Sequence, residues 1–242
     1  MEQFMTPEFW VAVGQIIMID ILLGGDNAVV IALACRKLPP AQRTQGIIWG
    51  TIGAIVLRVI LIFFALTLLA LPFLKIVGAL LLVWIGIKLI APDDEGGHDV
   101  AASDKLWAAV KTVIVADLVM SVDNVIAIAG AAQGAAQEHE MLLVIFGLLV
   151  SIPIIVWGSQ LVIKLMDRFP IIITAGGMLL GWIAGTMAIT DPAVAQPDAW
   201  TWMVKLPQTA VVKYACGIAG ALLVLAVGRW LDARNRTTAT PA

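Results

Sequence analysis

An acidic pattern occurs twice in this chain, each time within a stretch otherwise apolar enough to lie in a lipid bilayer. The first copy, DILLGGDNAVVIALA, starts at Asp20, and the second, DLVMSVDNVIAIAGA, starts 97 positions later at Asp117. Each copy holds an Asp, five further residues and then Asp-Asn. An ionised carboxylate in the bilayer core costs roughly 3 kcal/mol on insertion scales, so such residues usually have a function. The repeated pattern therefore predicts a cation site built from two related segments.

The composition is that of a polytopic membrane protein. Hydrophobic residues make up 61% of the chain and charged residues 13%, against about 25% charged residues in ordinary soluble domains. We expect an all-α fold, with one transmembrane domain over residues 1–242 and seven membrane-spanning helices. The N-terminal stretch contains Glu2 and Glu8 but no basic residue, so we do not expect a cleaved signal peptide. The expected helices cover residues 9–34, 45–70, 73–90, 106–132, 141–165, 171–189 and 208–231.

The basic residues predict the orientation, because cytoplasmic loops carry an excess of Lys and Arg. With the N-terminus outside and the C-terminus inside, the outer loops hold only Lys75 and Lys205, and Lys213 lies just inside the last helix. We therefore expect this orientation in the membrane. The inner positions then hold Arg36, Lys37, Arg43, Lys88, Lys105, Lys111, Lys164, Arg168, Arg229, Arg234 and Arg236.

The similarity between the two halves extends beyond the acidic pattern. Trp49-Gly50 matches Phe146-Gly147 at the same spacing, and VGALLLVWIG from Val77 matches AGGMLLGWIA from Ala175 after one extra residue. Residues 9–91 and 106–190 thus form two repeats of three helices, and the seventh helix lies outside them. Because three is odd, the second repeat should cross the membrane in the opposite sense, and inverted repeats of transporters place the substrate between the copies. An old duplication kept only for packing is the alternative.

The two acidic patterns supply oxygen ligands for a metal ion. The predicted ligands are Asp20, Asp26, Asn27, Asp117, Asp123 and Asn124. In a continuous helix Asp20 and Asp26 would project about 120° apart, but the glycine pair between them permits a local break. Close helix packing is the other explanation for these glycines. The second copy has Ser121-Val122 at that place, so its helix should stay more regular. Each Asn could instead form only an interhelical hydrogen bond.

Carboxylates and amide oxygens suit hard or borderline cations such as Mg²⁺, Ca²⁺ and Mn²⁺. Met120 could add a thioether that favours Mn²⁺, or simply fill space. Cys35 and Cys216 have no metal-ligand spacing, and we expect neither a disulfide nor a tightly bound cofactor.

Four carboxylates around one divalent ion leave two excess negative charges, which suggests that protons exchange with the metal. The position in the second repeat that corresponds to Arg58 holds Ile155, so the second repeat lacks this charge. Arg58 could neutralise a carboxylate, occupy the empty site, or form a fixed ion pair.

The motifs GGDNAVVIALA and SVDNVIAIAGA, each preceded by an Asp, resemble those of the TerC family of integral membrane proteins, within the LysE-like transporter superfamily. The resemblance covers about residues 9–189, and the six predicted ligands correspond to the acidic motif residues of the family. It implies a compact bacterial member concerned with manganese export and metal homeostasis, and with tellurite resistance in some members. The resemblance points to Mn²⁺, whereas the residues alone indicate a hard divalent cation.

We therefore expect a secondary transporter that exports a divalent cation. No nucleotide-binding motif is present, so an ion gradient should drive it. The alternative is an accessory membrane protein that helps to metallate or insert exported proteins, with a link to tellurite resistance. A membrane-embedded hydrolase would need a nucleophile or an HExxH-like metal site, so we expect no enzyme activity. The expected partners are the metal ion and membrane lipids but no nucleic acid, and a homo-oligomer is left open.

Overall fold

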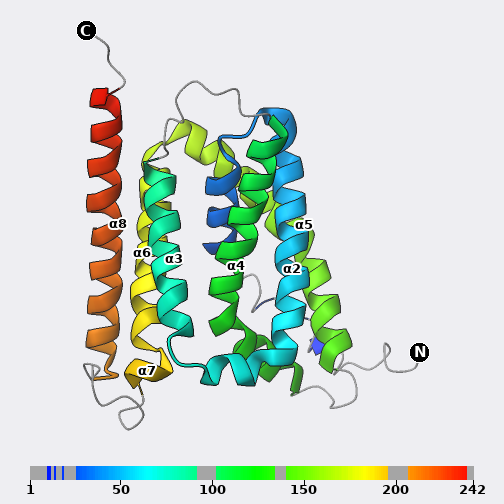
Figure 1. Cartoon of the computed structure of the whole chain (residues 1–242). Helices are drawn as coiled ribbons and strands as arrows, with labels where there is room; N and C mark the ends of the chain where they lie inside the picture. The colour runs from blue at the N-terminus through cyan, green and yellow to red at the C-terminus, as the bar shows by residue number, and fades with distance from the viewer. Residues whose placement is uncertain are drawn as a thin grey trace. The chain divides into compact units, whose positions relative to one another are not determined.

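The computed structural model describes residues 26–91, 102–133, 140–195 and 207–238, together with Trp10, Val11, Gly14 and Met18 (Figure 1). Within these ranges every regular element is a helix, which confirms the predicted all-α class. A first helix covers Asp26–Cys35. The others are α2 (Pro40–Ala70), α3 (Leu74–Ile90), α4 (Ala102–Gln133), α5 (Glu140–Arg168), α6 (Ile171–Ile189), α7 (Pro192–Ala195) and α8 (Ala210–Thr238).

Four stretches of these helices are long and apolar enough to cross a membrane. Helix α3 is also apolar but has 17 residues. The total of seven spans stays a prediction. Helix α2 begins at Pro40, earlier than expected, because proline is well accommodated in the first turn of a helix. The four stretches are Pro40–Leu61, Leu148–Arg168, Ile171–Ile189 and Ala210–Asn235.

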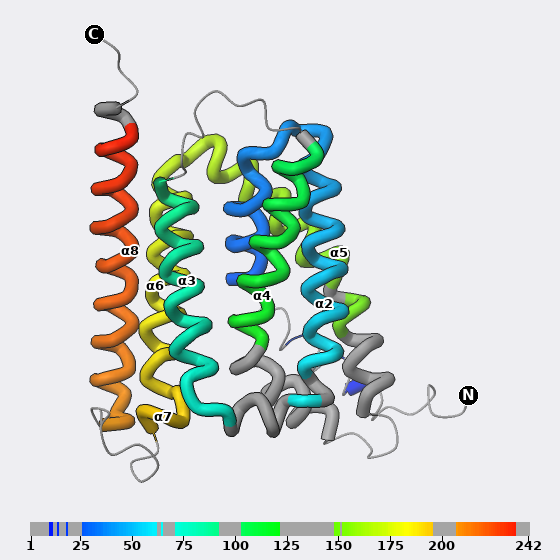
Figure 2. The backbone as a smooth tube through the Cα atoms, in the orientation of Figure 1, coloured from blue at the N-terminus to red at the C-terminus, as the bar shows by residue number. Residues whose placement is uncertain are grey.

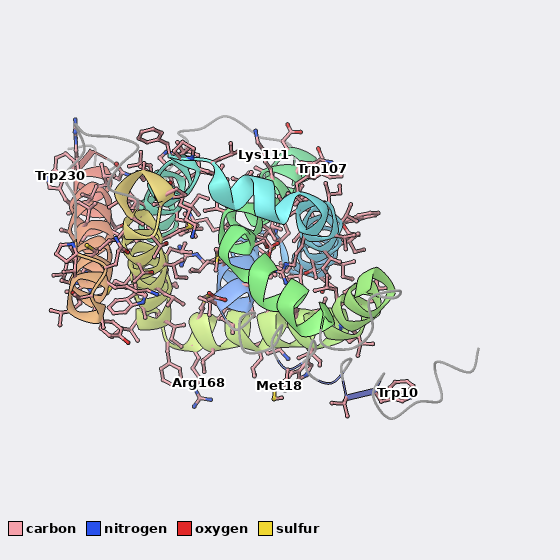
Figure 3. The ribbon with its side chains drawn as sticks, turned by 90° about the horizontal axis from the view of Figure 1, so that it is seen from below. Trp10, Met18, Trp107, Lys111, Arg168 and Trp230 are labelled. Carbon is pink, nitrogen blue, oxygen red and sulfur yellow. The ribbon has the colours of Figure 1, made fainter. Side chains whose placement is uncertain are left out.

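The outer surfaces of the helices carry large apolar side chains. Trp107 on α4, Ile171 on α6 and Trp230 on α8 are each more than half exposed, and Figure 3 labels the two tryptophans. A soluble monomer rarely exposes so many large apolar groups. These surfaces therefore suit contact with lipid.

The chain forms two compact units, which are described separately. The first unit, residues 1–66 and 102–164, contains the Asp26–Cys35 helix and most of α2, α4 and α5. A Cβ atom added at Gly50 would meet Val113 at 2.9 Å, and one added at Gly53 would meet Ile114 at 2.5 Å. Small residues on α2 thus let α4 approach closely, which is what the four-residue spacing of Gly46 and Gly50 in the sequence predicts.

The directions of the helices in this first unit follow from the same contacts. Later residues of α2 meet later residues of α4, so these two helices run parallel. The chain reverses between Cys35 and Pro40, so the Asp26–Cys35 helix runs antiparallel to both (Figure 2). The two segments that carry the acidic pattern therefore run in opposite senses within one unit.

The second unit, residues 67–101 and 165–242, contains α3, α6, α7 and α8. Helix α6 packs against both α3 and α8, and α3 also contacts α8. Added Cβ atoms at Gly181 and Gly185 would collide with the backbone carbonyl oxygens of Gly220 and Cys216. Helices α6 and α8 therefore touch backbone to backbone, which is what the four-residue spacing of Gly177, Gly181 and Gly185 in the sequence predicts for a helix-contact surface.

Asp191 connects the end of α6 to the start of α3 within this second unit. Its carboxylate is fully buried and accepts hydrogen bonds from the backbone N–H groups of Phe73 (2.9 Å), Lys75 (3.0 Å), Ile76 (3.3 Å) and Ala193 (2.8 Å). N–H groups in the first turn of a helix have no hydrogen-bond acceptor within the helix. The Asp191 side chain therefore accepts hydrogen bonds from such N–H groups at the starts of both α3 and α7. Phe73, before α3, has a positive φ of 67°.

Candidate cation site

Three of the six predicted ligands have described side chains. Asp26 and Asn27 begin the Asp26–Cys35 helix, and Asp117 lies in α4, so all three belong to the first unit. Asp20 and the glycine pair at 24–25 lie outside the described residues. Helix α4 runs without interruption through the second copy of the pattern, as the sequence predicted. Asp123 and Asn124 lie in this helix, but their side chains fall outside the described part of the chain.

A buried ion pair joins α2 to α4. The guanidinium of Arg58 donates from Nη2 to Asp117 Oδ1 at 2.6 Å and from Nε to Ser121 Oγ at 3.1 Å. The hydroxyl of Ser121 in turn donates to Asp117 Oδ2 at 3.0 Å. Arg58, Asp117 and Ser121 are only 3%, 7% and 0% exposed. Both carboxylate oxygens of Asp117 are therefore engaged by protein donors, and its charge is balanced by Arg58.

A second carboxylate lies within electrostatic reach of this pair. Asp26 is partly buried at the start of its helix, and its Oδ1 accepts the backbone N–H of Asn27 at 2.9 Å. The charges of Asp117 and Arg58 both act on the Asp26 carboxylate. The first unit thus gathers three charged groups from three helices, two of them predicted ligands.

Asn27 stands out because its side-chain amide is buried without a hydrogen-bond partner among the described residues. The residue is 4% exposed, and the unpaired atoms are Oδ1 and Nδ2. Leaving a buried polar group unsatisfied costs about 1–3 kcal/mol. An amide oxygen is also a ligand that hard cations accept. The unmet hydrogen-bonding capacity of Asn27 is therefore consistent with a ligand that binds there.

Two further buried hydroxyl groups, which the sequence analysis missed, also have no hydrogen-bond partner in the part of the chain that the structure describes. These are Thr51 Oγ1 on α2 and Ser159 Oγ on α5. Thr51 lies seven residues before Arg58, so the two share a face of α2. Ser159 follows Gly158, and a Cβ atom added at Gly158 would lie 3.9 Å from Ala28 Cβ. Ile155 and Ile163 lie four residues before and four residues after Ser159, and both are buried. This helical spacing of apolar residues is a sequence signal that could have placed Ser159 on an inward face of α5.

The described side chains by themselves do not form a complete metal site. Among them, no group of three or more His, Cys, Asp or Glu residues could hold a metal ion. Asp26, Asn27 and Asp117 supply two carboxylates and one amide oxygen, which are hard oxygen ligands. Met120 is buried in α4, and Cys35 and Cys216 are free thiols.

The same chain matches a known family over nearly its whole length. The model of the integral membrane protein TerC family matches residues 5–236. The chain belongs to this family. The resemblance carried by the doubled acidic pattern is thereby confirmed, and the protein is an integral membrane protein.

Several bacterial TerC relatives are similar to the chain. The uncharacterized membrane protein YjbE of Bacillus subtilis is 43% identical over 187 residues, which covers 77% of this chain and 83% of the relative. The uncharacterized membrane protein YceF of the same organism is 30% identical over 196 residues, covering 77% of this chain and 74% of the relative. The inner membrane protein YgdQ of Escherichia coli is 25% identical over 182 residues, covering 68% and 74%. No solved structure is significantly similar to this TerC chain.

Proposed function

We propose that this TerC family protein is a secondary transporter that exports a divalent metal cation, with Mn²⁺ as its substrate and protons as the exchanged ion. The observation that carries the proposal is the buried ion pair of Arg58 and Asp117, with the partly buried Asp26 within electrostatic reach and the unsatisfied side-chain amide of Asn27 beside Asp26. Ionisable residues within membrane helices are costly and usually mark an ion pathway. The choice of Mn²⁺ rests on the family resemblance, because the oxygen ligands alone fit any hard divalent cation.

The directions of the helices support an inverted repeat. Within the first unit, the Asp26–Cys35 helix and α4 carry the two copies of the pattern and run antiparallel. Within the second unit, α3 and α6 are the third helices of the two repeats. Asp191 at the end of α6 caps the start of α3, so these helices also run antiparallel. Opposite senses are what an inverted 3+3 arrangement requires. We propose this arrangement in the bacterial inner membrane, with the N-terminus outside and the C-terminus inside.

Mn²⁺ flux into proteoliposomes that contain only the purified protein tests the proposal. We expect inward or outward flux driven by a pH gradient, and at least a tenfold loss of flux in Asp26→Asn and Asp117→Asn variants. Such substitutions keep the side-chain shape but remove a carboxylate charge from the site. Asp104→Asn is the matched control, since Asp104 is exposed in the first turn of α4 and should leave flux unchanged.

The outcomes separate transport from the alternative role. Flux that is insensitive to both site substitutions would exclude this site as the pathway. Mn²⁺ binding by the folded protein without any flux would favour an accessory protein that supplies metal to exported proteins. Competition by Ca²⁺ and Mg²⁺ in the same assay measures the ion selectivity, which the ligand types do not determine.

A further inference from the structure

We propose that Arg58 is a built-in cation that occupies Asp117 when no metal is bound and is displaced when a divalent cation enters. Arg58 would then set the affinity of the site and promote release of the metal by returning to Asp117. The inference rests on the proposed transport function and assigns a role to a residue outside the predicted ligand set.

The geometry makes Arg58 and a metal ion compete for one carboxylate. Asp117 Oδ1 lies 2.6 Å from Arg58 Nη2, and Oδ2 accepts from Ser121 at 3.0 Å. A divalent ion coordinated by Asp117 would therefore lie close to the guanidinium. Two positive charges at such a distance repel strongly where little water screens them. Simultaneous occupation is unfavourable, so binding of the metal and pairing of Arg58 with Asp117 exclude each other.

Arg58 cannot yield its position by losing its charge, because the guanidinium stays protonated in proteins. It must instead move its side chain. The charge of Arg58 also acts on Asp26, so a displaced guanidinium remains under the attraction of a second carboxylate. The arginine side chain has several rotatable bonds, so its guanidinium can turn away from Asp117 once it gives up its hydrogen bond to Ser121.

The surroundings of the pair argue against a purely structural role. A structural ion pair needs only its own hydrogen bonds, which Ser121 completes. Here the charges of the pair also act on Asp26, and the side-chain amide of the next residue, Asn27, is buried without a hydrogen-bond partner among the described residues. The equivalent position of the second repeat is the buried Ile155, so only one half of the repeat carries the internal cation.

The test measures the Mn²⁺ affinity of the purified full-length protein by electron paramagnetic resonance of free Mn²⁺. We expect Arg58→Met to bind Mn²⁺ about tenfold or more tightly than the natural protein, and to release it more slowly in the flux assay. We expect this gain to fall below about threefold in an Asp117→Asn background, since the contested carboxylate charge is then absent. Lys111→Met is the matched control, because Lys111 is an exposed basic residue on α4 (Figure 3) and should leave affinity unchanged.

Equal or weaker Mn²⁺ binding by folded Arg58→Met protein would overturn the proposal while leaving transport itself intact. If Arg58→Met does not fold, Ser121→Ala decides, because it removes one hydrogen bond from Arg58 and one from Asp117 but retains the charge pair. It should tighten Mn²⁺ binding about threefold, and an unchanged affinity would count against the proposal. Natural protein that neither binds nor transports Mn²⁺ would overturn the transport function as well, so the two failures are distinguishable.

Discussion

Asp191 should be one of the most important single residues for the stability of the second unit. Its carboxylate joins the end of α6 to the starts of α3 and α7. Oδ1 accepts from Phe73 and Ala193, and Oδ2 accepts from Lys75 and Ile76. Asparagine in this place has nearly the same shape but only one acceptor oxygen. Whichever way the amide turns, its NH₂ group faces two backbone donors.

The expected loss follows from this count. Hydrogen bonds to a charged acceptor contribute about 1.5–3 kcal/mol each. The lower figure applies here, because N–H groups at helix starts can bond to water when the cap is lost. Asp191→Asn removes two such bonds, so we expect the free energy of unfolding to fall by about 3 kcal/mol. Asp191→Ala removes all four bonds and should cost more than Asp191→Asn.

Unfolding of the purified protein in detergent, followed by far-ultraviolet circular dichroism against denaturant, measures this difference. Asp104→Asn serves as the control, because Asp104 is an exposed acidic residue whose interaction with the start of α4 is worth about 0.3–1 kcal/mol. If Asp191→Asn destabilises the protein by no more than Asp104→Asn does, the carboxylate does not hold these helix starts together and the reasoning is wrong.

Two further predictions concern packing and the unsatisfied amide. Gly185→Ala should cost about 3 kcal/mol of unfolding free energy, because its Cβ would strike the backbone carbonyl of Cys216, which cannot rotate away. Gly158→Ala, whose Cβ would lie 3.9 Å from Ala28, should be neutral or slightly stabilising in the same measurement, and equal effects would refute the argument. Asn27→Leu should stabilise the fold by about 1–2 kcal/mol, because it replaces a buried amide without partners by an apolar group of similar size. The same variant should lose Mn²⁺ flux, and a variant that is less stable yet still transports would contradict both expectations.

Parts of the candidate site were predictable because they depend on residue type alone. Asp26, Asn27 and Asp117 are conspicuous as polar residues in apolar stretches, and the structure places all three in one unit. Ser121 completes the hydrogen bonds of Asp117, whereas the sequence suggested only that it leaves the second helix more regular than the glycine pair leaves the first. Its position four residues after Asp117 puts both on the same face of α4, a signal that the sequence does contain.

Local pattern determined the membrane class, the helical segments and the small-residue contact surfaces, because hydrophobicity, proline positions and glycine spacing act over a few residues. Helix α6 covers residues 171–189 as expected, and α2 and α8 differ from their predicted bounds only at the ends. These features can be predicted from the local sequence without knowing which helices pack against one another.

Only the tertiary structure decided which groups meet. Arg58 and Asp117 are 59 residues apart in the chain, and Asp191 reaches Phe73 across 118 residues. Such pairings depend on the rotation and axial register of whole helices, which are set by close contacts such as that of Gly50 with the side chain of Val113. The residue types gave Arg58 several equally good partners among the acids. The packing chose Asp117, because a buried charge is tolerated only where the fold brings an opposite charge to it.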